Sequence, residues 1–195
     1  MGGSVCPACG RVNREAAAFC DGCGARIAAQ PQETRKVVTI LFCDVTESTA
    51  LGEQLDPEAL RRVLQRFFRT ASAAIERYGG TVEKYIGDAV MAVFGVPQVH
   101  EDDALRAVRA AWELRCGLES LNAELGREHG VTLRTRIGIH TGEVVAGDGA
   151  DRQAMVSGDA GNVAARLEQL ANPDEIVLSA ATFELVRDDV SARRD

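Results

Sequence analysis

The sequence lacks a hydrophobic run that could cross a membrane. Its longest apolar stretch, Val37 to Cys43, has Thr39 within it and falls far short of the ~18 residues that a spanning helix needs. Residues 1 to 5 also lack the basic and then apolar order of a signal peptide. We therefore expect a cytoplasmic protein whose six cysteines are reduced or bound to metal.

Two further absences narrow the functional classes. The chain has no G-x-x-x-x-G-K-S/T pattern, which argues against a P-loop nucleotidase. It has no excess of positive charge either, because 22 basic residues face 29 acidic ones and the acidic excess lies after residue 30. An acidic body disfavours nucleic acid as the principal partner. It still admits a phosphorylated small molecule, because a bound divalent cation reverses the local sign of an acidic site.

Two closely spaced cysteine pairs stand near the start of the chain. The four cysteines are Cys6, Cys9, Cys20 and Cys23. Each C-x-x-C pair places two thiolates on one tight turn, and Gly10 and Gly24 let the backbone fold around a metal. Only Val12 and Phe19 offer sizeable apolar surface between the pairs, so metal binding must supply the folding free energy. The pattern predicts one structural Zn²⁺, and the alternatives are a redox dithiol or an iron site with the same ligands.

This pattern resembles the zinc-ribbon family over residues 1–26. Members of that family bind proteins or nucleic acids, or act as spacers, so a protein partner for this module is one hypothesis among these. Residues 27–35 lack apolar periodicity and include a proline, which indicates a linker. The larger domain is then expected to span residues 36–195.

The larger domain alternates helical and extended patterns. A β-branched run over 36–42 predicts a buried strand, and Gly87-Asp88 between two apolar runs predicts a hairpin. Asp56 before Pro57 predicts the capped start of a long helix. The expected strands are 36–42, 81–86, 89–94, 133–140, 143–146 and 175–178, and the expected helices are 56–78, 101–128, 161–171 and 180–186. Helices combined with an antiparallel hairpin indicate an α+β fold, a sheet with helices packed on it.

Asp44 and Asp88 are the first candidates for chemistry in this domain. Asp44 follows the first strand and Asp88 lies in the hairpin turn, so adjacent strands would bring both carboxylates to one edge of the sheet. Two carboxylates there suit a pair of Mg²⁺ ions that share their ligands with substrate phosphates. Spacing alone also fits an Asp44 that caps the next helix and an Asp88 that merely favours the turn. The remaining cysteines, Cys43 and Cys116, fall on expected core faces, and we expect both to be buried.

Four motifs resemble those of a known family. They are LFCDVTESTAL, GGTVEKYIGDAVMAVFG, RIGIHTGEVVAGD and SGDAGNVAARLEQLA. In order and spacing they resemble the successive motifs of the class III nucleotidyl cyclases. The resemblance implies a ferredoxin-like palm, βαββαβ with additions, that works as a head-to-tail homodimer with active sites between the subunits. It also implies conversion of a nucleoside triphosphate to the 3′,5′-cyclic nucleotide and pyrophosphate.

The resemblance assigns roles to individual residues. Asp44 and Asp88 match the ligands of two Mg²⁺ (or Mn²⁺) ions, and the backbone carbonyl of Val45 matches a third contact. Asn162 and Arg166 match the family's Asn-x-x-x-Arg pair and, four residues apart, share one helix face. Arg166 would stabilise charge on the α-phosphoryl oxygens, and Asn162 would orient the ribose.

The resemblance also identifies the residues that select the base. Lys84 matches the selecting position, where a lysine suits the acceptor N1 of adenine and the guanylyl enzymes usually have Glu, so ATP is the favoured substrate. Its partner position is Met155, where adenylyl enzymes usually have Asp, Thr or Ser, and a thioether is only a weak acceptor. Gly161 replaces the usual Val beside Asn162, which could loosen the start of that helix.

The family's last β-hairpin, whose lysine contacts the triphosphate, has no counterpart in these 195 residues. We therefore expect a C-terminally truncated form of the cyclase fold. The first interpretation is an adenylate cyclase that forms cyclic AMP from ATP as a homodimer. The alternative is a catalytically weak or silent cyclase-like domain that binds nucleotide or dimerises, with the zinc ribbon as the module that docks on a partner.

Overall fold

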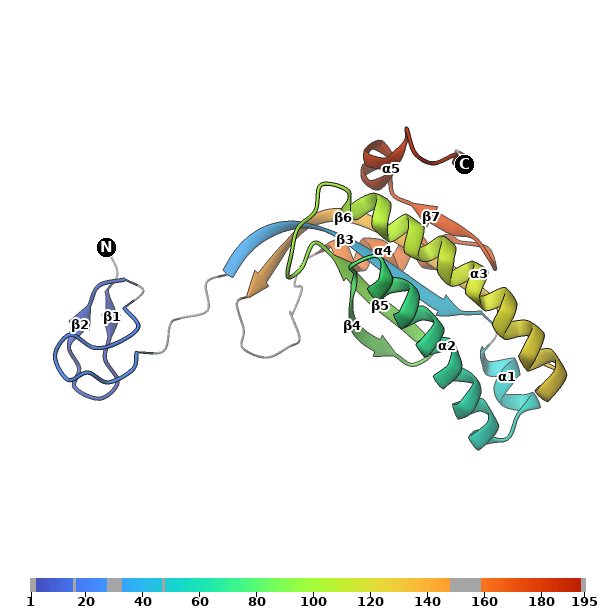
Figure 1. Cartoon of the computed structure of the whole chain (residues 1–195), viewed down its shortest axis with the longest axis horizontal. Coiled ribbons are helices and arrows are strands. Elements are labelled where there is room, and N and C mark those ends of the chain that lie inside the picture. The colour runs from blue at the N-terminus through green and yellow to red at the C-terminus, as the bar shows by residue number, and fades with distance from the viewer. Residues whose placement is uncertain (1–2, 16, 28–32, 47, 148–158, 194–195) are drawn as a thin grey trace.

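A five-stranded sheet organises the main body of the chain (Figure 1). The computed structural model describes residues 3–15, 17–27, 33–46, 48–147 and 159–193. The strands of the sheet are β3 (Glu33–Val45), β4 (Thr81–Ile86), β5 (Ala89–Phe94), β6 (Thr135–Gly147) and β7 (Ile176–Leu178). They lie in the order β4-β5-β3-β6-β7, and all neighbours are antiparallel except β6 and β7. The two longest strands, β3 and β6, pair with each other near the centre of the sheet.

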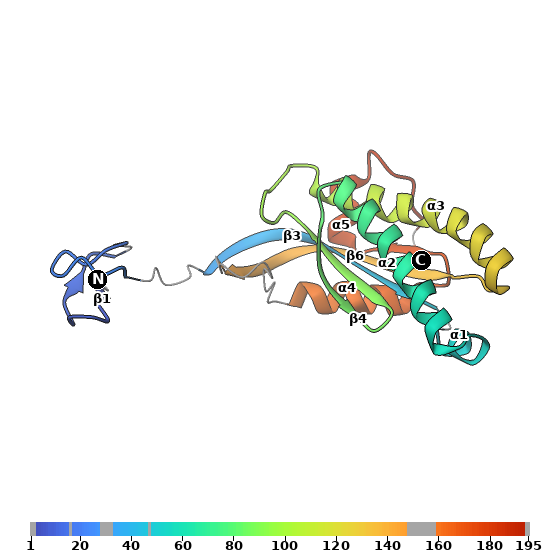
Figure 2. The same ribbon diagram turned by 60° about the horizontal axis from the view of Figure 1, so that its bottom comes forward.

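Helices cover both faces of this sheet (Figure 2). They are α1 (Ser48–Gln54), α2 (Pro57–Arg77), α3 (Asp103–His129), α4 (Asp159–Leu170) and α5 (Ala180–Val186). α2 and α3 pack on one face, and α4 packs on the other against β3 and β6. α1 and α2 follow each other between β3 and β4. If the two count as one helical segment, the order from β3 to β6 is βαββαβ. The predicted α+β fold with a ferredoxin-like palm is therefore confirmed, and no described helix is long and apolar enough to cross a membrane.

Alternate residues of β3 supply two separate cores. Leu41, Cys43 and Val45 belong to the cluster beneath α2 and α3, whereas Val38 and Ile40 belong to the cluster beneath α4. Since side chains alternate between the faces of a strand, a nearly continuous apolar run is what a strand buried on both sides requires. The same alternation places Asp44 on the face of the sheet that α4 covers.

Local sequence signals fix the start of α2 and the hairpin. Asp56 caps α2 because its carboxylate accepts hydrogen bonds from the N–H groups of Glu58 at 3.0 Å and Ala59 at 2.8 Å. β4 and β5 have the predicted bounds. Gly87 between them has φ 63°, which suits the first central position of a type II′ hairpin turn.

The central strands are longer than predicted. The expected strands 133–140 and 143–146 are one strand, β6, because β3 continues opposite and pairs through Thr141 and Gly142 without a break. β3 itself begins at Glu33, so the last residues of the expected linker 27–35 are strand. The sequence pattern of one strand at a time does not predict either extension, because β3 and β6 stabilise each other by pairing.

Two smaller expectations also differ from the structure. α4 begins at Asp159, two residues before the predicted start, so Gly161 lies inside its first turn. Cys43 is buried as expected, but Cys116 is exposed. It follows Trp112, also exposed, by one helical turn of α3, which places it on the face of α3 that turns away from the core.

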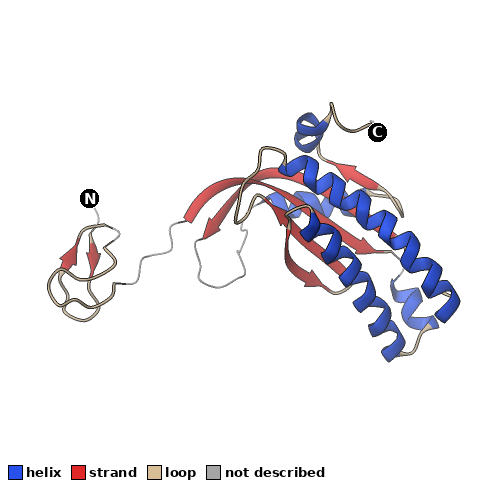
Figure 3. Ribbon diagram, in the orientation of Figure 1, coloured by secondary structure: helices blue, strands red, loops and turns tan. Residues whose placement is uncertain are grey.

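Residues 3–27 form a small unit around the four cysteines (Figure 3). Its strands are β1 (Ser4–Val5) and β2 (Val12–Asn13). The two cysteine turns are alike, because the N–H groups of Gly10 and Gly24 donate to the carbonyls of Cys6 and Cys20, both at 2.9 Å. Both glycines have φ near 70°, a conformation that glycine adopts without strain. Val12 and Phe19 are exposed by 65% and 61%, and the buried apolar cluster among the described residues of this unit is small, as predicted: Cys6, Ala17, Cys20 and Ile27.

Candidate active site

Asp44 and Asp88 lie at one edge of the sheet, as the sequence predicts. β3 pairs with β5, with Cys43 opposite Val90, so the end of β3 meets the turn that precedes β5. Burial raises the pKa of Asp44, and the charge of Asp88 adds to this rise. Val45 follows Asp44 and is 2% exposed. Its side chain is part of the core beneath α2 and α3, so only its backbone can serve a ligand on the Asp44 side.

Arg136 of β6 is the partner of Asp44 across the central strands. The two residues are register partners, and Nη2 of Arg136 donates to Oδ2 of Asp44 at 2.8 Å. Nε of Arg136 lies 3.0 Å from Oε1 of Glu168 on α4. With the residues that the structure describes, neither Nε nor Oε1 makes an aligned hydrogen bond, although both atoms are buried. Arg136 is thus bonded to one carboxylate and only close to a second.

Three carboxylates share this single guanidinium. Burial raises the pKa of Asp44, the hydrogen bond from Arg136 opposes this, and the charge of Asp88 adds to it. Burial also raises the pKa of Glu168, with Arg136 opposing and the charges of Asp44 and Asp88 adding. Among the described residues, this cluster therefore has three carboxylates and one cation. Carboxylate and carbonyl oxygens are the donors that Mg²⁺ and Mn²⁺ prefer, so these residues fit a divalent-metal site.

A close approach of α4 to β6 places Glu168 in this cluster. A Cβ at Gly138 would lie 2.3 Å from both the Ala164 carbonyl oxygen and the Glu168 nitrogen. Only glycine lets the helix backbone come this near the strand. Because residues 136 and 138 share one face of β6, the same contact brings Glu168 beside Arg136.

The structure does not bring Asn162 and Arg166 to the carboxylates of their own chain. The residues of α4 that face the sheet are Ala160, Ala164 and Glu168, all buried. Asn162 and Arg166 are exposed and follow Ala160 and Ala164 by two positions, which places them on the opposite side of the helix. Among the described residues, Asn162 donates a long hydrogen bond of 3.4 Å to Asp159.

Lys84 lies on the same side of the sheet as α4. It is exposed on β4, an edge strand, and its register partner on β5 is Met91. Met91 belongs to the core beneath α4, and a Cβ at Gly161 would be 3.5 Å from its Cε. Lys84 and the first turn of α4 therefore flank one side chain. Met155, the expected partner of Lys84 in base selection, lies outside the described residues.

Arg136 and Glu168 are the members of the cluster that sequence reasoning missed. Arg136 and Asp44 are 92 positions apart, and only the strand register makes them neighbours. A signal for Glu168 was present, because it continues the row of small apolar residues at 160 and 164 by one more helical turn. An acid in the buried row of a helix needs a cationic partner or a neutral form, and that rule would have singled it out.

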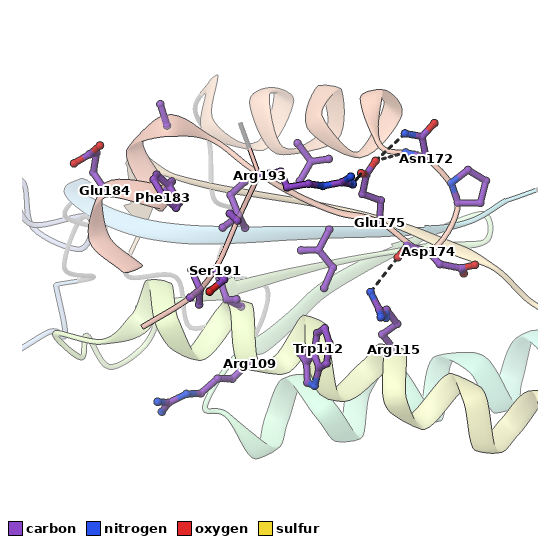
Figure 4. A pocket seen from close by; sticks show the side chains of 18 of the residues that line it. Arg109, Trp112, Arg115, Asn172, Asp174, Glu175, Phe183, Glu184, Ser191 and Arg193 are labelled. Atoms are coloured by element: carbon purple, nitrogen blue, oxygen red, sulfur yellow. Dashed lines mark hydrogen bonds and ion pairs between the residues drawn. The ribbon is translucent and has the colours of Figure 1, made fainter. Parts of the chain in front are cut away.

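A groove lies away from these residues (Figure 4). It has a volume of about 1170 Å³ and lies between α3, β7, α5 and residues 190–193. Arg115 lies over the ring of Trp112 at 4.7 Å and donates to the Asp174 carbonyl at 3.4 Å. β7 is separated from β3 by β6, and none of the candidate active-site residues lines the groove.

The four cysteines of the small unit converge on one point. Their sulfur atoms all lie within 4.8 Å of one another, a spacing that suits a tetrahedral four-thiolate site. Hydrogen bonds from the backbone N–H groups of Gly22 and Cys23 lower the pKa of Cys20 to about 6. A thiol that ionises readily is ready to bind a metal, so the cluster fits the metal site that the sequence predicts.

Comparison with known proteins assigns the larger domain. The family model described as the adenylate and guanylate cyclase catalytic domain matches residues 30–194. The adenylate cyclase of Anabaena cylindrica is 36% identical over 144 residues, which are 70% of this chain and 28% of that protein. Adenylate cyclase 1 of Rhizobium meliloti is 31% identical over 82% of this chain and 25% of that protein. The chain thus spans about a quarter of the length of these two relatives.

Solved structures agree with the family match. The adenylyl cyclase CyaB from P. aeruginosa superposes with a TM-score of 0.76 and 34% identity, covering 83% of this chain and 86% of that one. The guanylyl cyclase Cya2 superposes with a TM-score of 0.73 and 33% identity, covering 78% of this chain and 79% of that one. Both base preferences therefore occur among similar structures.

Proposed function

The chain belongs to the family of class III adenylate and guanylate cyclase catalytic domains, and we propose that it converts ATP to 3′,5′-cyclic AMP and pyrophosphate at sites formed between two copies. The observation that carries the proposal is the Asp44–Asp88 pair with its uncompensated negative charge. A domain that only dimerises has no need of such a cluster. The oxygen donors fit divalent cations, and a nucleoside triphosphate brings divalent cations with it.

The chemistry divides between metals and side chains. Two Mg²⁺ or Mn²⁺ ions held by Asp44, Asp88 and the Val45 carbonyl would activate the ribose 3′-hydroxyl and neutralise the triphosphate. Arg166 stabilises the charge that grows on the α-phosphoryl oxygens, and Asn162 holds the ribose so that its 3′-oxygen faces the α-phosphorus. The 3′-oxygen then bonds to phosphorus, its proton leaves to solvent, and pyrophosphate departs.

The direction of α4 supports a site shared by two chains. Asn162 and Arg166 lie on the side of α4 opposite the row that faces the sheet, so they serve a substrate outside their own chain's carboxylate cluster. A head-to-tail homodimer would complete the site, because the outer side of α4 in each copy would then face the carboxylate cluster of the other copy. Lys84 is exposed on the same side of the sheet as α4, next to the core residue Met91.

The preference for ATP rests on Lys84. An ammonium group donates hydrogen bonds only, and the N1 atom of adenine accepts, whereas the N1 atom of guanine donates. Lys84 is exposed on β4, where it is accessible to a base. The names of the relatives include both adenylate and guanylate cyclases. Support for ATP over GTP therefore comes from Lys84 and not from membership of the family.

The direct test is incubation of the purified chain with ATP or GTP in the presence of Mg²⁺ or Mn²⁺. We expect cyclic AMP as the main product, at a rate that depends on the concentration of dimer. Dimers that bind nucleotide but form no cyclic product with either substrate would support the silent regulatory domain instead.

Reversing the charge of Lys84 should change the substrate. In Lys84→Glu the carboxylate repels N1 of adenine and accepts from N1 of guanine, so we expect kcat/KM for ATP to fall by roughly 10-fold or more. The ratio of GTP to ATP turnover should rise. The matched control is Lys36→Glu, the same change at the only other lysine, which lies on β3 away from the turn. Equal losses in both variants would contradict a base-selecting role.

We also propose one Zn²⁺ per chain at the four cysteines. Because Val12 and Phe19 are exposed and the unit has no large core, chelation should unfold residues 3–27 and leave the catalytic fold intact. Elemental analysis and amide NMR spectra measure the two effects. Cys20→Ser should lose the metal, whereas Cys116→Ser, at an exposed cysteine of α3, should keep it. Protein that is purified without chelator and contains no zinc would refute the proposal.

A further inference from the structure

Arg136 occupies one of the two carboxylate oxygens with which Asp44 could bind a metal. Its Nη2 donates to Oδ2 of Asp44 at 2.8 Å, and Asp44 is the carboxylate to which the proposed function assigns divalent cations. A guanidinium and a cation compete for the same lone pairs. Arginine stays charged at any accessible pH, so it cannot leave Asp44 by losing its proton. A second anion within reach of Arg136 could take up this guanidinium and leave both oxygens of Asp44 available.

Glu168 is that second anion. Its Oε1 lies 3.0 Å from Nε of Arg136, and its side chain is only 7% exposed. Within the described residues neither atom has an aligned hydrogen bond, so both have unused bonding capacity. A rotation of the guanidinium that aligns Nε–H with Oε1 would withdraw Nη2 from Asp44.

The packing of α4 against β6 places the backbone of Glu168 beside Arg136. The backbone of α4 touches β6 at Gly138, where a Cβ would be 2.3 Å from the Glu168 nitrogen. Arg136 is two residues away on the same face of β6. A buried carboxylate whose backbone is held next to a guanidinium can accept it at little entropic cost.

We propose that Glu168 is a positioning residue of the metal site, which takes up the guanidinium of Arg136 and so frees Asp44 for a divalent cation. The inference rests on the proposed function, since it assumes that Asp44 binds the metal. It extends that function to Arg136 and Glu168, because the guanidinium of Arg136 would bond Asp44 when the metal is absent and Glu168 when the metal is bound. It also links the metal site to α4, the helix that presents Asn162 and Arg166.

The test is a double-mutant cycle on Mn²⁺ binding, followed by electron paramagnetic resonance of free Mn²⁺ with no nucleotide present. Glu168→Gln should weaken Mn²⁺ binding by ~10-fold, because Asp44 is then the only described carboxylate in close contact with Arg136. In an Arg136→Gln background Asp44 is already free, and adding Glu168→Gln should change the affinity by no more than about 2-fold. Equal effects in both backgrounds would mean that Glu168 acts through its charge alone and would overturn the proposal.

Three controls separate the possible failures. Asp44→Ala should abolish the binding, and if it does not, the proposed metal role of Asp44 fails rather than that of Glu168. Glu119→Gln removes the same charge from an exposed position on α3 and should leave the affinity unchanged. Thermal melting shows which variants are folded.

A measurement on the unmodified protein covers the case in which an Arg136 variant does not fold. The Nε–H resonance of Arg136 should move downfield as Mg²⁺ saturates the site, because Nε–H gains a charge-assisted hydrogen bond to Glu168. In Glu168→Gln the resonance should not move. An Nε–H resonance that stays in place in the unmodified protein while Mg²⁺ binds would overturn the proposal.

Discussion

Asp44→Ala and Arg166→Ala should each be nearly inactive alone and should recover activity when mixed. Loss of one well-placed electrostatic group typically lowers kcat by ~10²–10³, and we expect at least this from either change. If Asp44 of one copy and Arg166 of the other serve the same substrate, a mixed dimer has one site with both changes and one site with neither. Random exchange makes half of the dimers mixed, so about a quarter of all sites are intact. Turnover of cyclic AMP in the mixture measures this recovery.

The matched control mixes Asp44→Ala with Asp88→Ala. Both residues belong to the same carboxylate cluster, so every site in a mixed dimer lacks one of them and no recovery is expected. Subunit exchange must be verified by sedimentation of labelled chains in both mixtures. A mixture of Asp44→Ala and Arg166→Ala that exchanges subunits and stays inactive would refute the shared site.

The fold was predictable from sequence where local signals determine it. The hairpin 81–94 was predicted to the residue, because Gly87 marks the turn and apolar runs end on each side of it. The capped start of α2 followed from Asp56 and Pro57. The break expected within β6 was wrong, because pairing with β3 over 13 residues decides that strand and no local residue does.

The candidate site divides in the same way. Asp44 and Asp88 were predicted as neighbours, because each lies at the end of a predicted strand and the two strands are adjacent. Arg136 and Glu168 were missed, because the first depends on the register of two strands and the second on how closely α4 approaches the sheet. The sequence also did not predict that Asn162 and Arg166 face away from the sheet. Helical spacing shows that they share one face of α4, but only the packing of α4 shows which face it is.

Gly138→Ala should be among the most damaging single changes in the catalytic fold. The new Cβ would meet two backbone atoms of α4 at 2.3 Å, the Ala164 oxygen and the Glu168 nitrogen. Backbone atoms cannot turn aside as a side-chain end can, so α4 must move as a body and lose the packing of its buried alanines. Overpacking of this kind costs about 3 kcal/mol, which for a chain of this size lowers Tm by roughly 6–12 °C. Calorimetric melting of the two proteins measures the loss.

The same change should lower activity even at temperatures where the protein is folded. α4 bears Asn162 and Arg166 on one side and Glu168 on the other, so a shift of about 1 Å displaces all three and can cost ~10² in rate. Gly126→Ala is the matched control, because a Cβ at that exposed position of α3 meets nothing within 4 Å. It should stabilise the helix slightly, by up to about 1 kcal/mol, with turnover unchanged. If Gly138→Ala melts and turns over like Gly126→Ala, the contact between α4 and β6 is not what holds these residues in place.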